Sequence, residues 1–99
     1  MQISYSPRFA RHYRKLPLSE KLEIEEREEI FRHNPFDPRL KTHKLHGGYR
    51  GYWSFSVSRS KRIMFELVGQ NKVIFINIGD HDIYKWLDYV KIKVSTSKI

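Results

Sequence analysis

Apolar residues at helical spacing dominate the first third of the chain. Residues 2–5 have the pattern of a short strand, and Ser6 then offers a capping hydroxyl ahead of Pro7, whose ring suits a first helical position. The apolar residues that follow at helical spacing are Phe9, Tyr13 and Leu16. We therefore expect a short helix that ends before Pro17.

A second helix is expected from a cap at Ser19 to about Asn34. Acidic residues are concentrated in its first half, where the helix dipole favours negative charge. Its apolar residues do not form one stripe, because two pairs point in different directions: Leu22 with Ile30, and Ile24 with Phe31. We expect this helix to be partly exposed to solvent.

The pattern changes after the turn-rich segment 34–38. Apolar and polar residues alternate along 52–57 and 62–67, and 73–78 is an almost unbroken apolar run. Connections of hairpin length separate these three segments, which predicts antiparallel pairing. The run 73–78 is expected to be a central strand buried on both faces.

These elements predict an α+β fold. An N-terminal strand and a helical hairpin pack on one face of a twisted, mainly antiparallel sheet, and a short helix ends the chain. The sequence has no repeat, linker or low-complexity block, so we expect a single domain over residues 1–99. The second face of the sheet is left for function.

Composition narrows the class of protein. No apolar run approaches the roughly 20 residues of a membrane span, and the first residues lack the apolar stretch of a signal peptide. We therefore expect a cytoplasmic protein that does not associate with membranes. The chain has no cysteine, which excludes disulfide frameworks and thiolate zinc sites.

The positive charge is unevenly distributed. The formal net charge is +8, yet six of the eleven acidic residues lie within Glu20–Glu29. The rest of the chain has 17 basic and 5 acidic side chains, a net charge of +12. Such a surface attracts a polyanion, and nucleic acid is the first candidate. The alternative is charge that only maintains solubility.

Polar side chains interrupt the apolar pattern at residues 43–48, at Arg62 and at residues 79–84. In a small sheet, strand ends and loops lie within about 10 to 15 Å of one another, so we expect these groups to converge on one face. Histidine can exchange a proton near neutral pH, tyrosine can donate one, and arginine can bind a phosphate. Transesterification of RNA needs these operations, and the substrate's own 2′-hydroxyl is the nucleophile.

Each of these residues also has a purely structural interpretation. His43 or His46 could hydrogen-bond the backbone of a loop. Arg62 could pair with Glu66 on its own strand. The aspartates on either side of His81 could be helix caps.

The aromatic residues and the histidines leave two further alternatives. Tyr84 and Trp86 could be core residues of a short terminal helix, and Trp53 fits the core better than a platform for stacking bases. Zinc or manganese donors are present in His43, His46, His81 and Asp82. Their spacing matches no established ligand pattern and their surroundings are basic, so we expect neither a metal nor another cofactor.

The order of four motifs resembles the RelE/ParE superfamily of toxins, particularly its RNA-cleaving branches. The motifs are His43-x-Leu45-x-Gly47, Gly51-Tyr52-Trp53-Ser54, Arg62-Ile63-Met64-Phe65, and Gly79-x-His81 with Tyr84 nearby. The resemblance covers essentially the whole chain. It implies a cytoplasmic endoribonuclease that enters the ribosomal A site, cuts mRNA there, and is held silent by a cognate antitoxin.

The resemblance also implies roles for individual residues. Arg62 matches the strand arginine that contacts the scissile phosphate, and His81 matches the catalytic basic residue after the glycine. His43 matches a further histidine of the branch with several catalytic histidines, and Tyr84 resembles the C-terminal aromatic that stacks or donates a proton. The chain departs from the family at residues 54–56, which read Ser-Phe-Ser where the branches carry catalytic lysines or a histidine.

Basic side chains around these positions are expected to bind the RNA. They are Lys41, Lys44, His46, Arg50, Arg59 and Lys61. The main alternative is a ParE-like inhibitor of DNA gyrase without nuclease activity, and a further one is a module that binds nucleic acid without cutting it. The proton-transfer set favours the nuclease, because a gyrase inhibitor does not need one.

Overall fold

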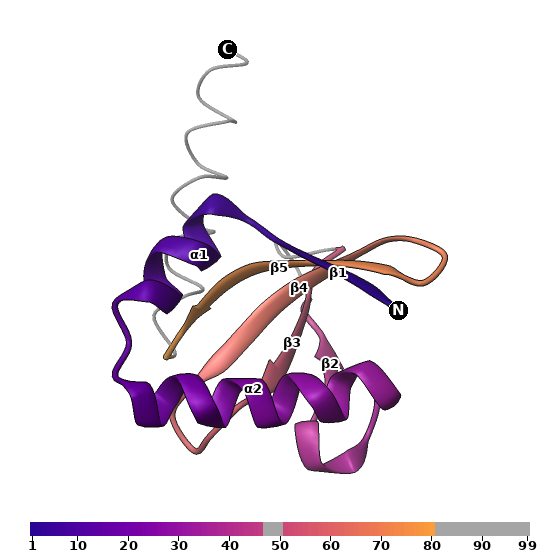
Figure 1. Cartoon of the computed structure of the whole chain (residues 1–99). Coiled ribbons are helices and arrows are strands. Elements are labelled where there is room, and N and C mark those ends of the chain that lie inside the picture. Colours follow the sequence, from indigo (N-terminus) through magenta and orange to yellow (C-terminus); the bar gives the residue numbers. More distant parts are fainter. Residues whose placement is uncertain (47–50, 81–99) are drawn as a thin grey trace.

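The computed structural model describes residues 1–46 and 51–80 (Figure 1). The elements are β1 (Gln2–Tyr5), α1 (Pro7–Arg14), α2 (Leu18–His33), η1 (Pro38–Leu40), β2 (His43–Lys44), β3 (Trp53–Ser56), β4 (Arg62–Gly69) and β5 (Lys72–Gly79). The five strands form one sheet in the order β1-β5-β4-β3-β2. β1 is parallel to β5, and the other neighbours are antiparallel.

This arrangement confirms the predicted α+β fold with helices packed on a mainly antiparallel sheet. The expected C-terminal helix lies outside the described residues. The sequence pattern did not reveal β2 or η1, because elements of two and three residues are too short to show a periodicity. None of the described helices is long and apolar enough to cross a membrane.

The predicted start of α1 is confirmed. The Ser6 hydroxyl accepts a hydrogen bond from the backbone N–H of Phe9 at 3.0 Å, as a helix cap does. The same hydroxyl donates to the carbonyl oxygen of Ile76 at 2.6 Å, which ties the start of α1 to β5. The helix ends at Arg14, before Pro17, as expected.

The predicted cap of α2 at Ser19 is wrong. The helix begins one residue earlier, at Leu18, and Pro17 with an extended backbone occupies the cap position. The Pro17 carbonyl accepts the backbone N–H groups of Glu20 and Lys21, both at 3.1 Å. Because the carbonyl of a cap residue accepts the first helical bonds, Ser19 falls inside the first turn.

Five phenylalanines form the centre of the core. The ring of Phe31 from α2 lies 4.8 Å from that of Phe55 and 5.0 Å from that of Phe65. It also lies 5.4 Å from the ring of Phe75, which Phe9 of α1 approaches at 5.6 Å. Both helices therefore pack on the same face of the sheet, as the ribbon shows (Figure 1).

The exposure of α2 agrees with its imperfect stripe. Ile24 and Phe31 are buried, whereas Leu22 is 55% exposed. In its second half, α2 is joined to β1 by polar side chains, because the Tyr5 hydroxyl donates to Oε1 of Glu28. Nη2 of Arg32 donates to the same oxygen at 3.0 Å. The helix is thus held by the apolar contacts of Ile24 and Phe31 together with the hydrogen bond between Tyr5 and Glu28.

The strand β5 has neighbours on both sides, which confirms its interior position. Its burial is less complete than predicted, because Ile74 and Ile76 are only half-buried. A register irregularity next to Met64 places Asn77 opposite that residue. Asn77 and Met64 are both buried, and they lie on the sheet face away from the helices.

Candidate functional site

The face of the sheet away from the helices brings two of the expected catalytic residues together. His43 is the register partner of Ser54, and Ser54 is the partner of Met64. Arg62 is opposite Ser56, two residues further along β3, so alternation places it on the same face as His43. Two strand spacings and two residue rises separate the Cα atoms of His43 and Arg62 by roughly 12 Å. Side chains of their length can therefore contact one group between them.

His43 is exposed and is oriented by the backbone. Its Nδ1 lies 3.0 Å from the carbonyl oxygen of Lys41. Lys41 ends η1 in the left-handed conformation, with a φ of 53°. Because a carbonyl only accepts, Nδ1 of the neutral ring carries the proton and Nε2 is left as an acceptor. The loop contact expected from the structural interpretation of His43 is therefore present, and it also prepares Nε2 to take a proton.

Arg62 is half-buried and is held by the β3–β4 hairpin. Its Nη1 donates to the carbonyl oxygens of Ser58 at 3.1 Å, Lys61 at 3.2 Å and Arg59 at 3.4 Å. In the described parts of the chain its polar contacts go to this backbone rather than to Glu66. A guanidinium group has five N–H donors, so contacts through Nη1 leave further donors to bind an anion.

A basic pocket of about 460 Å³ lies beside Arg62, where α2, η1 and the β3–β4 hairpin meet. Its lining residues are Arg27, Arg39, Lys41, Ser56, Val57, Ser58, Arg59 and Arg62. Five of them are cationic, two carry hydroxyl groups and none is acidic. Such a lining favours an anionic ligand.

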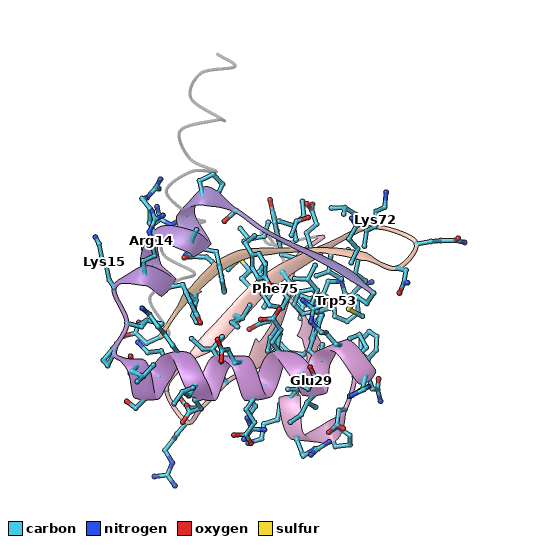
Figure 2. The ribbon with its side chains drawn as sticks, viewed as in Figure 1. Arg14, Lys15, Glu29, Trp53, Lys72 and Phe75 are labelled. Atoms are coloured by element: carbon cyan, nitrogen blue, oxygen red, sulfur yellow. The ribbon has the colours of Figure 1, made fainter. Side chains whose placement is uncertain are left out.

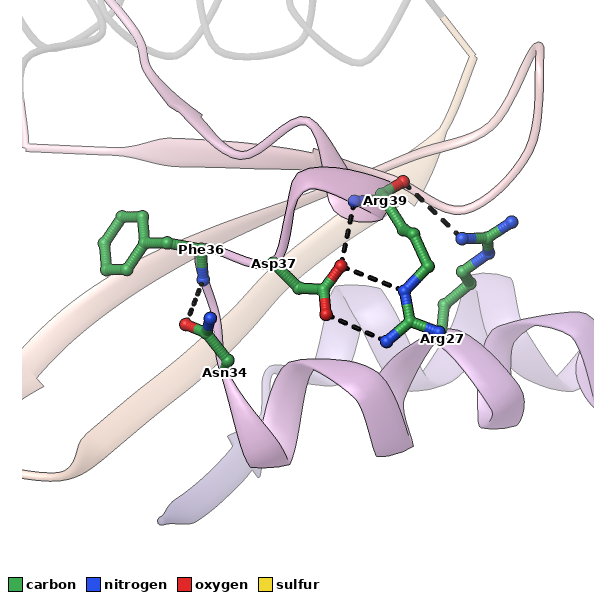
Figure 3. A network of polar contacts seen from close by, with 5 residues as sticks. All are labelled: Arg27, Asn34, Phe36, Asp37 and Arg39. Carbon is green, nitrogen blue, oxygen red and sulfur yellow. Dashed lines mark hydrogen bonds and ion pairs between the residues drawn. The ribbon is translucent and has the colours of Figure 1, made fainter.

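Asp37 holds Arg39 of η1, and the backbone of Arg39 contacts Arg27 of α2 (Figure 3). Its carboxylate accepts from Nε of Arg39 at 3.0 Å and from Nη2 at 2.8 Å, and it also accepts from the backbone N–H of Arg39 at 2.9 Å. These hydrogen bonds lower the pKa of Asp37 to about 2. Nη1 of Arg27 donates to the carbonyl oxygen of Arg39 at 3.5 Å, so the two arginines are neighbours.

The expected RNA-binding lysines do not share one face. Lys41 lines the basic pocket, together with Arg59. Lys44, in contrast, is the register partner of Trp53, and its Nζ lies 5.5 Å from the centre of the Trp53 ring. Trp53 packs against the core, as its core interpretation predicts. Lys44 is therefore on the face opposite His43 and apart from the pocket.

Of the remaining expected residues, some lie within the described parts and others lie outside them. His46 is exposed at the end of the first part, and Lys61 is half-buried in the hairpin. Gly79 pairs with Arg62, so the strand leading towards His81 ends beside that arginine. Three expected residues lie outside the described parts: Arg50, His81 and Tyr84. Within residues 1–46 and 51–80, no three metal-ligating side chains are grouped together.

Sequence reasoning missed Arg27 and Arg39. Arg27 is one of only two basic residues within Glu20–Glu29, where it looks like a partner for neighbouring glutamates. Arg39 follows a turn-rich segment that carries no periodic signal. Only the packing of α2 and η1 beside the hairpin brings both residues to the same pocket as Arg62.

No family model and no curated protein sequence matches the chain. Solved structures do match it. A YoeB/ParE toxin from Agrobacterium tumefaciens is 19% identical, with a TM-score of 0.71 over 82% of this chain and 99% of that one. The YoeB-YefM toxin-antitoxin complex from Staphylococcus aureus matches with 20% identity and a TM-score of 0.67, over 82% and 97% of the two chains.

An archaeal RelE-RelB complex from Pyrococcus horikoshii OT3 also matches, with 12% identity and a TM-score of 0.65 over 80% of this chain and 92% of that one. The matches cover nearly all of each solved chain. At these identities the likeness concerns the fold. It confirms that the chain has the architecture of the RelE/ParE toxins, as the motif order predicted.

Proposed function

We propose that this protein is the toxin of a toxin–antitoxin pair and that it cleaves mRNA on the ribosome, in the cytoplasm. The observation that carries the proposal is the placement of His43 and Arg62 on one sheet face beside the basic pocket. The fold supports it, because solved toxins share this architecture. A proton acceptor, a phosphate-binding group and a positive surface are the parts that RNA cleavage needs.

In this mechanism a histidine removes the proton of the RNA 2′-hydroxyl. His43 suits that role because Nε2 is an acceptor on an exposed ring, and His81 is the other candidate. The 2′-oxygen then attacks the adjacent phosphorus, and Arg62 stabilises the negative charge that grows on the phosphate oxygens. Tyr84 or the second histidine protonates the 5′-oxygen as its bond to phosphorus breaks. The products are a 2′,3′-cyclic phosphate and a free 5′-hydroxyl.

The strand β3 supports a histidine-based mechanism. RNA-cleaving relatives are expected to carry catalytic lysines or a histidine at the positions of residues 54–56. In this protein Ser54 and Phe55 are buried, and Ser56 lines the basic pocket. None of the three can act as a base near neutral pH. The proton acceptor must therefore come from another element, and β2 carries one in His43.

A cognate antitoxin is the second part of the proposal. The structures with this fold include toxins solved together with the antitoxins YefM and RelB. Outside Glu20–Glu29 the chain carries a net charge of +12, which an acidic antitoxin segment would neutralise. An antitoxin bound over the basic pocket would block the approach of RNA.

The function is tested by adding the purified protein to translating ribosomes and mapping the mRNA ends. We expect ends at defined codons that carry a 2′,3′-cyclic phosphate. Intact mRNA together with inhibited supercoiling by gyrase would replace the proposal with the ParE-like alternative. RNA that is bound but stays whole would replace it with a non-catalytic binding module.

Arg62→Ala is the most direct variant. Loss of one charge-assisted contact to the transition state should raise the barrier by about 3 kcal/mol, a roughly hundredfold slower cleavage. Because Arg62 also supports the hairpin, the melting temperature must be measured alongside, and Arg62→Lys restores the charge without the planar fork. Arg32→Ala, which removes an arginine paired with Glu28 instead, is the control and should cleave normally. An unchanged rate in Arg62→Ala would remove Arg62 from the mechanism.

A further inference from the structure

The basic pocket extends beyond what cleavage at Arg62 requires. We propose that it binds a second phosphate of the RNA strand, next to the scissile one, and that Arg27 and Arg39 are the residues that recognise it. The proposal rests on the proposed function, since it names a subsite for the same substrate. Neither arginine is needed for the proton transfers, so the subsite serves binding and alignment of the strand.

The chemistry of the lining selects an anion. The carboxylates of Asp37 and Glu26 act on Arg39, and the five cations that line the pocket still leave a net positive charge. Asp37 accepts hydrogen bonds from Nε and Nη2 of Arg39. The same guanidinium has further N–H donors on Nη1, and these can bind an anion. The hydroxyl groups of Ser56 and Ser58 add neutral donors that suit a phosphate or a ribose.

The arginines are held in place before a ligand arrives. Asp37 contacts Arg39 through two side-chain hydrogen bonds, and Arg27 is directed to the Arg39 carbonyl (Figure 3). At the β3–β4 hairpin, backbone carbonyls hold Arg62. Long side chains that are already ordered lose less conformational entropy on binding. These contacts therefore distinguish the pocket from a patch of freely moving surface charges.

The position of the pocket identifies the ligand as a nucleic acid strand. Arg62 and Ser56 line the pocket, and they also lie on the face that carries His43. An RNA strand with one phosphate at Arg62 can continue directly into the pocket. The volume of about 460 Å³ exceeds the needs of a lone phosphate and lies in the range of pockets that hold molecules of nucleotide size.

The experiment measures binding of a short single-stranded RNA with 2′-O-methyl groups throughout, which cannot be cleaved. Affinity is followed by fluorescence anisotropy over a range of salt concentrations for the wild type, Arg27→Gln and Arg32→Gln. The two variants remove the same charge from the same helix, but Arg32 is paired with Glu28 and does not line the pocket. We expect the salt slope to fall by about 0.7 in Arg27→Gln, as for one lost phosphate contact, and to stay near the wild-type value in Arg32→Gln.

A second variant separates local contacts from net charge. Asp37→Asn combined with Arg39→Gln leaves the charge of the protein unchanged and removes the guanidinium from the pocket. We expect it to weaken RNA binding several-fold, with a thermal unfolding curve that shows a folded protein. Equal salt slopes in Arg27→Gln and Arg32→Gln, or wild-type affinity in the double variant, would overturn the subsite.

The outcomes also separate the subsite from the proposed function. Binding that depends on Arg27 in a protein that cuts no mRNA would uphold the phosphate site and refute the nuclease. Cleavage of mRNA together with equal salt slopes in Arg27→Gln and Arg32→Gln would uphold the nuclease and refute the phosphate site. A glutamate-rich peptide whose affinity falls in Arg27→Gln, while the RNA salt slopes of Arg27→Gln and Arg32→Gln stay equal, would assign the pocket to an acidic protein segment and overturn the proposal.

Discussion

At the scale of the residue, backbone carbonyl groups prepare the two central side chains for chemistry. The Lys41 carbonyl holds Nδ1 of His43, so the neutral ring presents Nε2 as the acceptor. Three hairpin carbonyls hold Nη1 of Arg62 and keep its guanidinium beside the basic pocket. The sequence could supply the residue types but not these partners, because the carbonyl that a side chain meets depends on how the loop turns.

Tyr5 allows a prediction about pH. Burial, together with hydrogen bonding to Glu28 and the charge of that carboxylate, raises the pKa of Tyr5 to about 12, although 46% of the residue surface is exposed. In the unfolded chain this phenol ionises near pH 10, so its contribution to stability is complete below pH 10 and is lost as the pH rises to 12. We expect the melting temperature of the wild type to fall more steeply than that of Tyr5→Phe over this interval. Parallel profiles would contradict the assignment.

At the scale of the element, most boundaries follow from local sequence, and the exceptions have local reasons. Ser6 and Pro7 start α1 as predicted, because capping and the fixed φ of proline act within a few residues. The prediction of Ser19 as the cap of α2 was wrong, because the Pro17 carbonyl accepts the first helical N–H groups and no side-chain cap is needed. The strand β2 is stabilised by its pairing with β3, which two residues of sequence cannot reveal.

Substitution of Ser6 tests how much the cap of α1 contributes to stability. Ser6→Ala removes both the cap of α1 and the hydrogen bond to the Ile76 carbonyl, so it should lower the free energy of unfolding by about 1 to 2 kcal/mol. Urea unfolding followed by circular dichroism measures the change. Ser4→Ala, at an exposed position of β1, is the matched control and should differ from the wild type by less than about 0.5 kcal/mol. Equal loss in both variants would mean that the cap contributes nothing specific.

At the scale of the whole molecule, one side of the sheet supplies stability and the other carries the proposed chemistry. The aromatic core joins both helices to three strands through Phe31 and Phe75. Phe75, on β5, is labelled in Figure 2. The opposite face presents His43 and Arg62. Because the aromatic core lies on the helix side, the exposed His43 on the second face can be exchanged for function without opening that core.

Phe31→Ala tests the dependence of the fold on this core. The side chain is fully buried among three aromatic rings, so its removal should cost about 4 kcal/mol, a large part of the 5 to 15 kcal/mol typical of a domain. Phe36→Ala makes the same change at a ring that is 54% exposed and should cost about 1 kcal/mol or less. Chemical denaturation of both variants makes the comparison. Similar losses in the two would show that Phe31 is not central.

The sequence alone determined the order of the main elements, the sheet face of most side chains and the excess of positive charge, because periodicity, capping and composition act over short stretches of chain. Only the tertiary structure decided which side chains from distant elements become neighbours. It brought Arg27 and Arg39 to the same pocket as Arg62, placed Lys44 over the ring of Trp53, and placed Asn77 opposite Met64 through a register shift. These results depend on the packing of α2 against the sheet and on strand register, which arise from contacts between residues far apart in the chain.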